Sequence, residues 1–544
     1  MVADGSESGR LNLEPELAYP VNAWTRHRGR FLEPGSALQL PAGQPQTQST
    51  AYVANALLVR CGDSRRVLEV VSRVAKKAGY YAELDDQANI DHAWLEGLEL
   101  SDDQRHEITR SWVERIRLVA DRESAELVSG DDAWRVLQEY RLDVGPDDPD
   151  YLAVALEHLV VTTIPTIDGA PITNSHGIGG TPITNSHGIG GAPITNSHGI
   201  SGYAIPGSGG RQPVNWVGPA PRARFTDGKV RRPVVAVLDT GVGAHPWFAD
   251  SHVLRNVQVE GMPLDVAPST PDSEVIGVTD PLIGLLDPDA GHGTFIAGLV
   301  RQQCPDATVL SVRLFHGDGV VGEWDLLRVL QLLTVRQALA VNGNPRYQPV
   351  DVISMSFGYY HEQPSDVGYS SLLQDWVRLL GEYGVAVVAA AGNDATVRPM
   401  YPAALAPHAG SAVTDAPDRV PVSCVGALNP DGTVALFSNA GSWVAYHRPG
   451  AALVSSYPRS FDASESPTVE LEYHGSQRAS IDPDDFSAGF AVWSGTSFAA
   501  PIFAGQLAAQ LLEAYAHGDV DTDSSVAVAR TRQVLATMPK VSRT

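Results

Sequence analysis

The chain has 544 residues, more than one compact core normally accommodates, so we expect more than one domain. Its hydrophobic content of 43% fits a water-soluble globular protein. The formal net charge of −24 argues against nucleic acid and anionic membranes as partners, and it favours neutral or basic peptides.

The amino terminus lacks a basic start followed by an apolar core, and no run of about eighteen apolar residues occurs in the chain. We therefore expect a cytoplasmic location. The cysteines Cys61, Cys304 and Cys424 are too few and too scattered for a disulfide framework. Each is expected to be a small buried apolar residue.

After an amino-terminal extension at 1–51, residues 52–165 have the pattern of a small α/β domain. The run ANALLVR at 54–60 predicts a strand, and the apolar stripe within 64–78 predicts an amphipathic helix. Further along we expect a strand at 79–84, helices at 101–127 and 132–142, and a strand at 159–163. This alternation is typical of a small α/β sandwich.

Residues 166–231 are interpreted as a Gly- and Pro-rich linker. The unit PITNSHGI begins at Pro171, Pro182 and Pro193, an eleven-residue period. Near-identical copies of this composition favour a flexible or turn-rich linker over a packed core. The alternative is a metal site formed by His176, His187 and His198, but no cysteine or carboxylate pattern accompanies these histidines.

Two motifs follow the linker. In VVAVLDTGVG, the β-branched run starting at Val234 predicts a buried parallel strand that ends at Asp239, and catalytic groups of open α/β sheets gather at such strand ends. In GHGTFIAG, small residues at helical spacing over 293–300 place His292 at the amino end of a helix. Asp287 and Asp289 precede this motif and form either a cation site or a plain turn.

Two further motifs lie in the second half of the chain. The run VAVVAAAGND predicts a strand at 385–389 and a small-residue loop that ends at Asn393. In SGTSFAAP, Ser497 precedes a helical stretch at 498–512, with Pro501 in the first turn, where no intrahelical donor is required. Between them, 455–489 is rich in Asp, Glu, Ser and Pro and is interpreted as an inserted surface loop that could reach the substrate cleft.

Each motif alone has a simpler interpretation. Asp239 could form a turn at a strand end, His292 a turn or a metal ligand, and Ser497 a helix N-cap. Asn393 beside glycine could serve a left-handed turn. All four polar positions are filled, however, and the order Asp, His, Ser is one of the chain orders in which a catalytic triad recurs.

The chemistry explains why these residue types would meet. A serine hydroxyl is a poor nucleophile at neutral pH, so Ser497 needs a base, His292, to take its proton as it attacks a carbonyl carbon. His292 then donates that proton to the leaving amine. A buried carboxylate, here Asp239, holds the imidazole in one tautomer and stabilises its cation.

The motifs resemble those of the subtilisin-like serine peptidases, over residues 232–516. The resemblance implies a three-layer α/β fold with a mostly parallel sheet, preceded by the small α/β domain and followed by a carboxyl-terminal segment at 517–544. It also implies that Asn393 donates a hydrogen bond to the oxyanion. The substrate-binding residues that it implies are Ser356, Phe357 and Gly358, which would pair with an extended peptide, and Ala389, Ala390, Ala391 and Gly392, which would line the specificity pocket.

The sequence departs from the family pattern at Phe498, where Met is more usual, and at Trp493. Both changes are apolar and should alter packing more than chemistry. The resemblance implies no organic cofactor, and the calcium sites common in secreted relatives cannot be assigned.

The resemblance further implies that residues 52–165 act as an intramolecular chaperone and inhibitor, and the linker is a natural place for self-cleavage. The alternative is an independent sensor or partner-binding domain. For the whole chain, we expect a serine endopeptidase acting on peptides or proteins. A catalytically silent scaffold and a peptide ligase are the competing functions.

Overall fold

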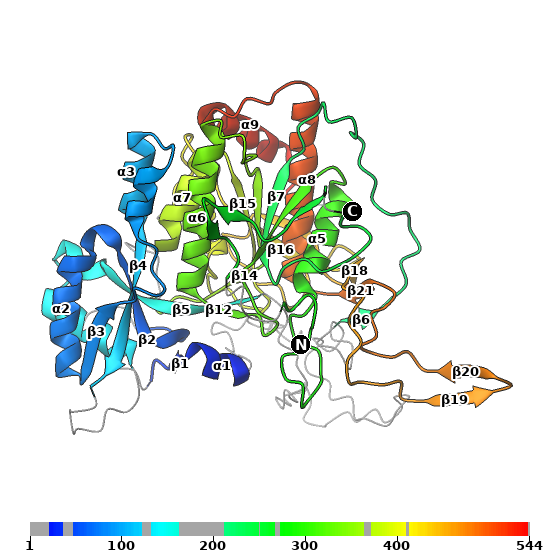
Figure 1. The fold of residues 1–544 in the computed structure, drawn as a ribbon, viewed down its shortest axis with the longest axis horizontal. Helices are drawn as coiled ribbons and strands as arrows, with labels where there is room; N and C mark the ends of the chain where they lie inside the picture. The colour runs from blue at the N-terminus through cyan, green and yellow to red at the C-terminus, as the bar shows by residue number, and fades with distance from the viewer. Residues whose placement is uncertain are drawn as a thin grey trace, which may run out of the picture.

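The computed structural model describes residues 21–35, 47–121, 132–162, 211–249, 251–266, 272–363, 372–409 and 413–541 (Figure 1). They form a smaller amino-terminal domain and a larger domain that pack against each other. The three PITNSHGI repeats lie outside the described residues.

The larger domain is built on a seven-stranded sheet in which every neighbouring pair is parallel. The strand order is β17 (Tyr446–Pro449), β16 (Ser423–Leu428), β15 (Ala386–Ala390), β13 (Val352–Met355), β7 (Val234–Asp239), β11 (Thr308–Arg313) and β8 (Val253–Leu254).

Helices cover both faces of this sheet, because interior strands such as β7 are apolar on both sides. Val234 packs in a core cluster with α6 (Glu323–Val341) and α7 (Leu372–Glu382). Its neighbour Val235 packs in a second cluster on the opposite face. That second face is covered by α5 (His292–Gln303) and α8 (Thr496–Ala516), with α9 (Ser524–Thr537) beside α8. The predicted three-layer α/β fold is confirmed.

The amino-terminal domain has an antiparallel sheet with two helices on one face. Its strands are β1 (Gly29–Leu32), β2 (Thr50–Arg60), β3 (Tyr80–Leu84), β4 (Val113–Ala120) and β5 (Val154–Thr162), and the covering helices are α2 (Ser64–Lys77) and α4 (Ala133–Val144). The remaining helical elements are α1 (Val21–His27), α3 (Asp102–Ser111), η1 (Cys61–Asp63), η2 (His92–Gly97) and η3 (Pro149–Leu152).

One sequence prediction for this domain is wrong. A continuous helix was expected at 101–127, but the chain leaves α3 at Trp112 and enters β4, which pairs with β2 on one side and β3 on the other. The buried residues of β4 include Val113 and Ile116, whose spacing of three imitates a helix. Pairing on both edges of β4 overrides that local signal.

The two domains share a sheet. β5 crosses from the amino-terminal domain into the larger one, where it lies between β12 (Val320–Gly322) and β14 (Phe357–Gly358) and pairs with both in antiparallel register (Figure 1). The carboxyl end of β5 therefore reaches the face of the larger domain that carries the predicted substrate edge.

The predicted insertion and the end of the predicted linker both contain strands. Within the predicted insertion, β19 (Glu470–Tyr473) and β20 (Ser476–Ala479) form an exposed hairpin that projects from the body, so the insertion is more than a loop (Figure 1). At the end of the predicted linker, β6 (Gln212–Pro213) joins a small sheet with β21 (Phe490–Trp493) and β18 (Leu453–Ser456). Two further short strands, β9 (Gln258–Val259) and β10 (Met262–Pro263), form a pair.

None of the helices in the described ranges is long and apolar enough to cross a membrane.

Candidate active site

The predicted pair Asp239 and His292 meets at the centre of the larger domain. Asp239 is the last residue of β7, and His292 is the first residue of α5. Nδ1 of His292 lies 2.7 Å from Oδ1 of Asp239, and both side chains are fully buried. Because a carboxylate can only accept, Nδ1 carries the proton and the lone pair of the neutral ring is on Nε2.

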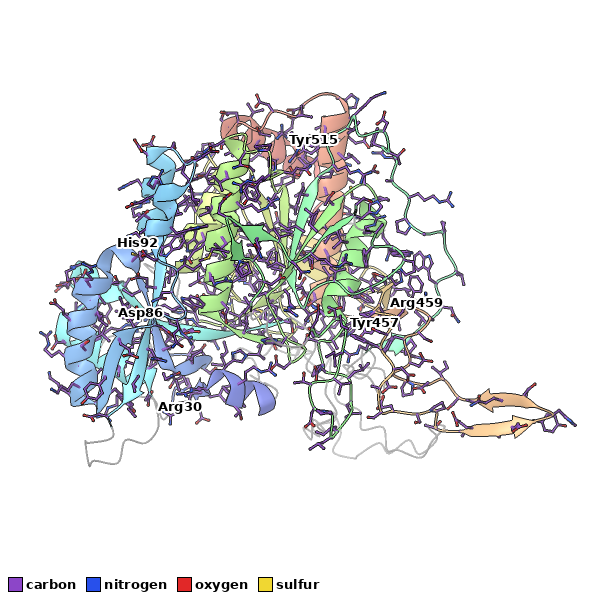
Figure 2. The ribbon with its side chains drawn as sticks, viewed as in Figure 1. Arg30, Asp86, His92, Tyr457, Arg459 and Tyr515 are labelled. Atoms are coloured by element: carbon purple, nitrogen blue, oxygen red, sulfur yellow. The ribbon has the colours of Figure 1, made fainter. Side chains whose placement is uncertain are left out.

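The start of α5 depends on two glycines. Gly291 has a φ of +85°, and a Cβ built on it would lie 2.3 Å from the ring of Tyr457, which Figure 2 labels. A Cβ on Gly293 would lie 2.1 Å from the carbonyl oxygen of Gly241, in the loop after β7. Only residues without a side chain allow the backbone on both sides of His292 to approach so closely.

Sequence reasoning missed Glu274, which ties the Asp239 loop to the His292 helix. Its carboxyl group accepts hydrogen bonds from the hydroxyls of Thr240 and Thr294 and from the backbone N–H of Gly291, at 3.1 Å for the last. Burial raises the pKa of Glu274 to about 8, against the lowering effect of the two threonines. A lone Glu in a turn-rich segment carries no sequence signal for this role.

The His292 ring lies in an apolar enclosure. The rings of Trp493 and Phe498 pack on it at centroid distances of 5.5 and 5.3 Å, so the two departures from the family pattern contact the predicted base. Nε2 of His292 has no hydrogen-bond partner among the described residues. Burial lowers the pKa of His292, but Asp239, with smaller contributions from Asp289 and Glu274, raises it, and the net pKa is above the usual value.

Ser497 is the second residue of α8, next to Phe498. The helix begins at Thr496, two residues earlier than expected, so Pro501 lies beyond the first turn and that prediction is wrong. Pro501 has no N–H to donate to the carbonyl four residues back, which is that of Ser497. The hydroxyl of Ser356 supplies the missing donor, at 2.8 Å, and thereby fixes the backbone of Ser497.

Asn393 is oriented by the same helix end. Its Oδ1 accepts hydrogen bonds from the backbone N–H and the hydroxyl of Thr496, both at 2.9 Å. A backbone N–H can only donate, so the amide oxygen faces Thr496 and the NH₂ group faces away from it. The side chain of Asn439 holds the loop that carries Asn393, because it accepts from the N–H groups of Asp394 and Thr396.

The predicted substrate edge pairs with the protein's own β5. Phe357 lies opposite Thr162 and Gly358 opposite Val161, while β12 pairs with the other edge of β5. The hydroxyl of Thr162 also donates to the buried carboxylate of Asp289, at 2.6 Å. The end of an extended strand therefore lies where the resemblance places a peptide substrate.

The other predicted substrate-binding residues, Ala389 to Gly392, are buried at and after the end of β15. A Cβ on Gly392, whose φ is +103°, would lie 2.2 Å from the side chain of Asn439. Their contribution to a specificity pocket stays a prediction.

The two aspartates before His292 have separate partners. Asp287 accepts from the N–H of Thr279 at 3.1 Å, and Asp289 accepts from Thr162. Burial raises the pKa of Asp289 to about 7. Neither belongs to a group of three potential metal ligands in the described part of the chain.

A second buried histidine, not anticipated from the sequence, lies where the domains meet. Nδ1 of His158 in β5 is 2.6 Å from a carboxylate oxygen of Glu323, and Nε2 is 2.9 Å from a carboxylate oxygen of Glu362. Both partners belong to the larger domain. Although burial lowers the pKa of His158, the two carboxylates raise it to about 9.

The larger domain matches a known protein family. A model of the subtilase family matches residues 231–538, more than half of the chain. The chain belongs to the subtilase family. This confirms the resemblance to subtilisin-like serine peptidases that the motifs indicated.

Individual relatives are distant and matched only in part. The minor extracellular protease Epr of Bacillus subtilis (strain 168) is 29% identical over 196 residues, which are 34% of this chain and 25% of Epr. Thermitase of Thermoactinomyces vulgaris is 31% identical over 194 residues, which are 34% of this chain and 58% of thermitase. The crystal structure of fervidolysin from Fervidobacterium pennivorans, a keratinolytic enzyme related to subtilisin, aligns with 87% of this chain and 56% of its own, with 18% identity and a TM-score of 0.42.

Proposed function

We propose that the protein is a serine endopeptidase in which Ser497 attacks the substrate, His292 transfers the proton and Asp239 orients His292. The observation that carries the proposal is the bond of 2.7 Å between Asp239 and His292, which leaves Nε2 as the basic nitrogen of a buried ring. Membership of the subtilase family supports peptides or proteins as substrates.

The reaction would proceed in two halves. The oxygen of Ser497 attacks the scissile carbonyl carbon as Nε2 of His292 takes the hydroxyl proton, and the imidazolium then gives this proton to the leaving amine. Water, deprotonated by Nε2, attacks the acyl-enzyme and releases the second product. The raised pKa of His292 supports the base role, because it reflects stabilisation of the imidazolium by Asp239.

Two hydrogen-bond donors would stabilise the negative charge on the tetrahedral intermediate. One is the NH₂ group of Asn393, turned away from Thr496, and the other is the backbone N–H of Ser497 at the amino end of α8. The hydrogen bond from the Ser356 hydroxyl to the Ser497 carbonyl supports a fixed position for the backbone of Ser497.

The amino-terminal domain would act as an inhibitor within the same chain. Its β5 pairs with β14 and β12 in the way an extended peptide adds to a sheet edge, so a substrate would compete with β5 for the same main-chain bonds. Activation would then require cleavage after β5, in the linker, and release of the domain.

A fluorophosphonate probe tests the nucleophile. Intact mass of the purified full-length protein is compared with that of Ser497→Ala, and with Ser487→Ala as a control, since Ser487 is an exposed serine of the insertion. We expect one adduct on the wild type and on Ser487→Ala, and none on Ser497→Ala. An adduct that persists in Ser497→Ala would overturn the proposal.

The inhibitor role has a separate test. The wild-type chain should convert during incubation to a form that has lost the amino-terminal domain, whereas Ser497→Ala should stay intact. A Ser497→Ala chain cut at the wild-type rate would exclude self-processing. Thr162→Val, which loses the hydrogen bond to Asp289 but keeps its size, should shorten any lag before peptide hydrolysis.

Two other functions give different results. A silent scaffold would not react with the probe even after the residues before Gly210 are removed. A peptide ligase would incorporate an added amine nucleophile into its product, whereas a hydrolase yields the free acid.

A further inference from the structure

A mixed set of potential metal ligands lies in the amino-terminal domain, far from the triad in the sequence. Three groups of possible ligands occur among the described residues, and this one, Cys61, His92 and Glu114, combines sulfur, nitrogen and oxygen. In a second group, His158 already faces a carboxylate with each ring nitrogen. The third consists of the aspartates 462, 482 and 484 alone.

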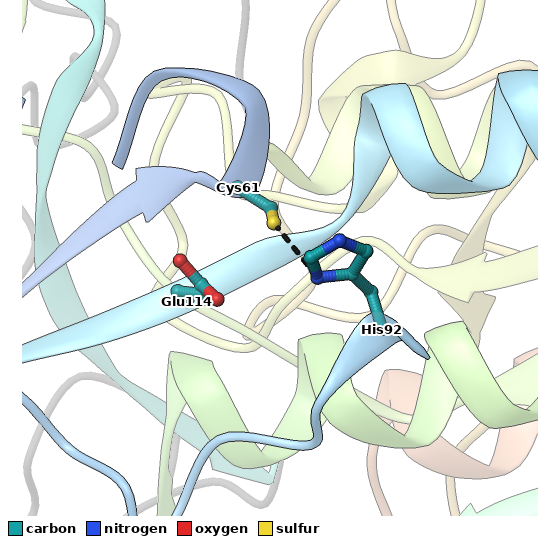
Figure 3. Close-up of side chains that lie close together, drawn as sticks. All are labelled: Cys61, His92 and Glu114. Atoms are coloured by element: carbon teal, nitrogen blue, oxygen red, sulfur yellow. Dashed lines mark hydrogen bonds between the residues drawn. The ribbon is translucent and has the colours of Figure 1, made fainter. Parts of the chain in front are cut away.

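The three side chains converge from separate segments (Figure 3). Cys61 directly follows β2, His92 begins η2, and Glu114 is the second residue of β4. Figure 2 labels His92 in the amino-terminal domain, just below α3 in that view. The sequence separations of 31 and 22 residues hide this set from any local motif search.

The distances suit one ion. Sγ of Cys61 lies 3.3 Å from Nδ1 of His92, and one ligand atom from each of the three residues lies within 4.8 Å of the others. Two ligands on a tetrahedral zinc ion, at about 2.3 Å for sulfur and about 2.0 Å for nitrogen, are separated by about 3.5 Å. Small side-chain rotations would complete the site.

The electrostatics also call for a cation. Oε2 of Glu114 is buried and has no hydrogen-bond partner in the described ranges of the chain. A divalent cation would satisfy the carboxylate oxygen and balance the charge of a thiolate and a carboxylate.

We propose that Cys61, His92 and Glu114 bind a thiophilic divalent cation of the zinc class. On binding, the Cys61 S–H bond breaks, a sulfur–metal bond forms and one proton passes to solvent. Nδ1 of neutral His92 and a carboxylate oxygen of Glu114 each supply a lone pair, and the fourth position is open to water.

The site lies on the part of the domain that docks on the catalytic domain. Arg60, next to Cys61, pairs with Asp375 of α7 at 2.8 Å. Leu95 of η2 belongs to the same core cluster as Trp376 of α7. An ion that joins the end of β2, η2 and β4 would therefore brace this docking face, and its loss would loosen the contact between the domains.

Cobalt(II) is the test ion, because a thiolate bound to it gives a charge-transfer band in the near ultraviolet. The full-length chain carrying Ser497→Ala is treated with a chelator, desalted and titrated with cobalt chloride. We expect that band at one equivalent, its loss on addition of zinc, and release of one proton per ion in weakly buffered solution. The affinity should fall as the pH falls, because protons compete for the sulfur and the imidazole.

Variants identify the ligands. Cys61→Ser should abolish the thiolate band, and Glu114→Gln and His92→Ala should each weaken cobalt binding by about 100-fold or more. His106 is an exposed histidine of the neighbouring α3, and His106→Ala should bind cobalt with the same affinity as the parent. Far-ultraviolet circular dichroism checks that each variant folds.

Two results would overturn the proposal. One is a parent chain that gives no thiolate–cobalt band, including a spectrum due to nitrogen and oxygen ligands alone. The other is a folded Glu114→Gln or His92→Ala variant with unchanged affinity. Both remain decisive if Cys61→Ser fails to fold.

Discussion

Two fully buried histidines, His292 in the larger domain and His158 at the contact between the domains, differ in how many acceptors face the ring. His292 has one carboxylate on Nδ1 and no partner for Nε2 among the described residues. His158 has a carboxylate on each nitrogen. Since carboxylates only accept, His158 must donate from both nitrogens and is an imidazolium, whereas His292 can be neutral and take up a proton.

The difference teaches that burial alone does not decide what a histidine does. Burial lowers the pKa of both rings, and carboxylates raise it in both. With a second carboxylate on the ring, His158 stays a cation, and its ion pairs stabilise the contact of β5 with the larger domain. Mutation of His292 should therefore lower kcat, whereas mutation of His158 should lower stability.

The largest effect is expected at His292, the proposed base. His292→Ala should lower kcat by about 10⁶-fold, the order found for subtilisin, because Ser497 loses its base. Peptide hydrolysis at saturating substrate measures it, with His106→Ala as the control. A folded His292→Ala variant that keeps more than a small fraction of activity would show that His292 is not the base.

The next largest effect is expected at Asn393, the proposed oxyanion donor. Asn393→Ala should lower kcat by about 10²–10³-fold with little change in KM, because the lost bond forms only as charge develops. Thr496→Val, which removes one of the two bonds that orient Asn393, should have a smaller effect in the same direction. If Asn393→Ala instead raises KM by as much as it lowers kcat, Asn393 also contributes to binding of the substrate in the ground state.

His158→Phe should leave the chemistry intact but weaken the domain contact. Glu323 and Glu362 would then be buried without their cation, at a cost of about 3–5 kcal/mol in the free energy of unfolding. Urea unfolding of the full-length Ser497→Ala chain measures this cost at neutral pH.

The same variant tests how the stability contributed by His158 changes with pH. The pKa of His158 rises from its usual 6.5 to about 9 on folding, so its contribution is complete below pH 6.5 and is lost as the pH rises through 9. Buried acids with raised pKa values, such as Glu274, also make stability fall with rising pH. The difference between parent and His158→Phe should therefore shrink from pH 6.5 to 9, and a constant difference would refute the cationic assignment.

The smallest effect is expected at Glu274. Its pKa of about 8 means that the carboxyl group is largely protonated at neutral pH, so Glu274→Gln should change kcat less than about tenfold. Glu274→Ala leaves the donors of Thr240, Thr294 and Gly291 without their shared acceptor and should be the more damaging change. Similar kcat values for the two variants would remove Glu274 from the support of the His292 helix.

The cysteine prediction shows where composition misleads. Cys304 and Cys424 are buried, as expected, but Cys61 is only half-buried and contacts His92. Its position at the end of β2, close to His92 and Glu114, decides its surroundings. No property of the residue type could have separated it from the other two.

The sequence alone determined the strand that ends at Asp239, the helices that begin at or beside His292 and Ser497, and the layered fold, because these follow from local periodicity and short motifs. Only the tertiary structure decided that β4 is a strand, that β5 pairs with β14, and that His158 is a cation. Strand pairing and burial depend on partners that are distant in the chain, such as Glu323 and Glu362 for His158. Local sequence patterns carry no record of which distant groups will meet.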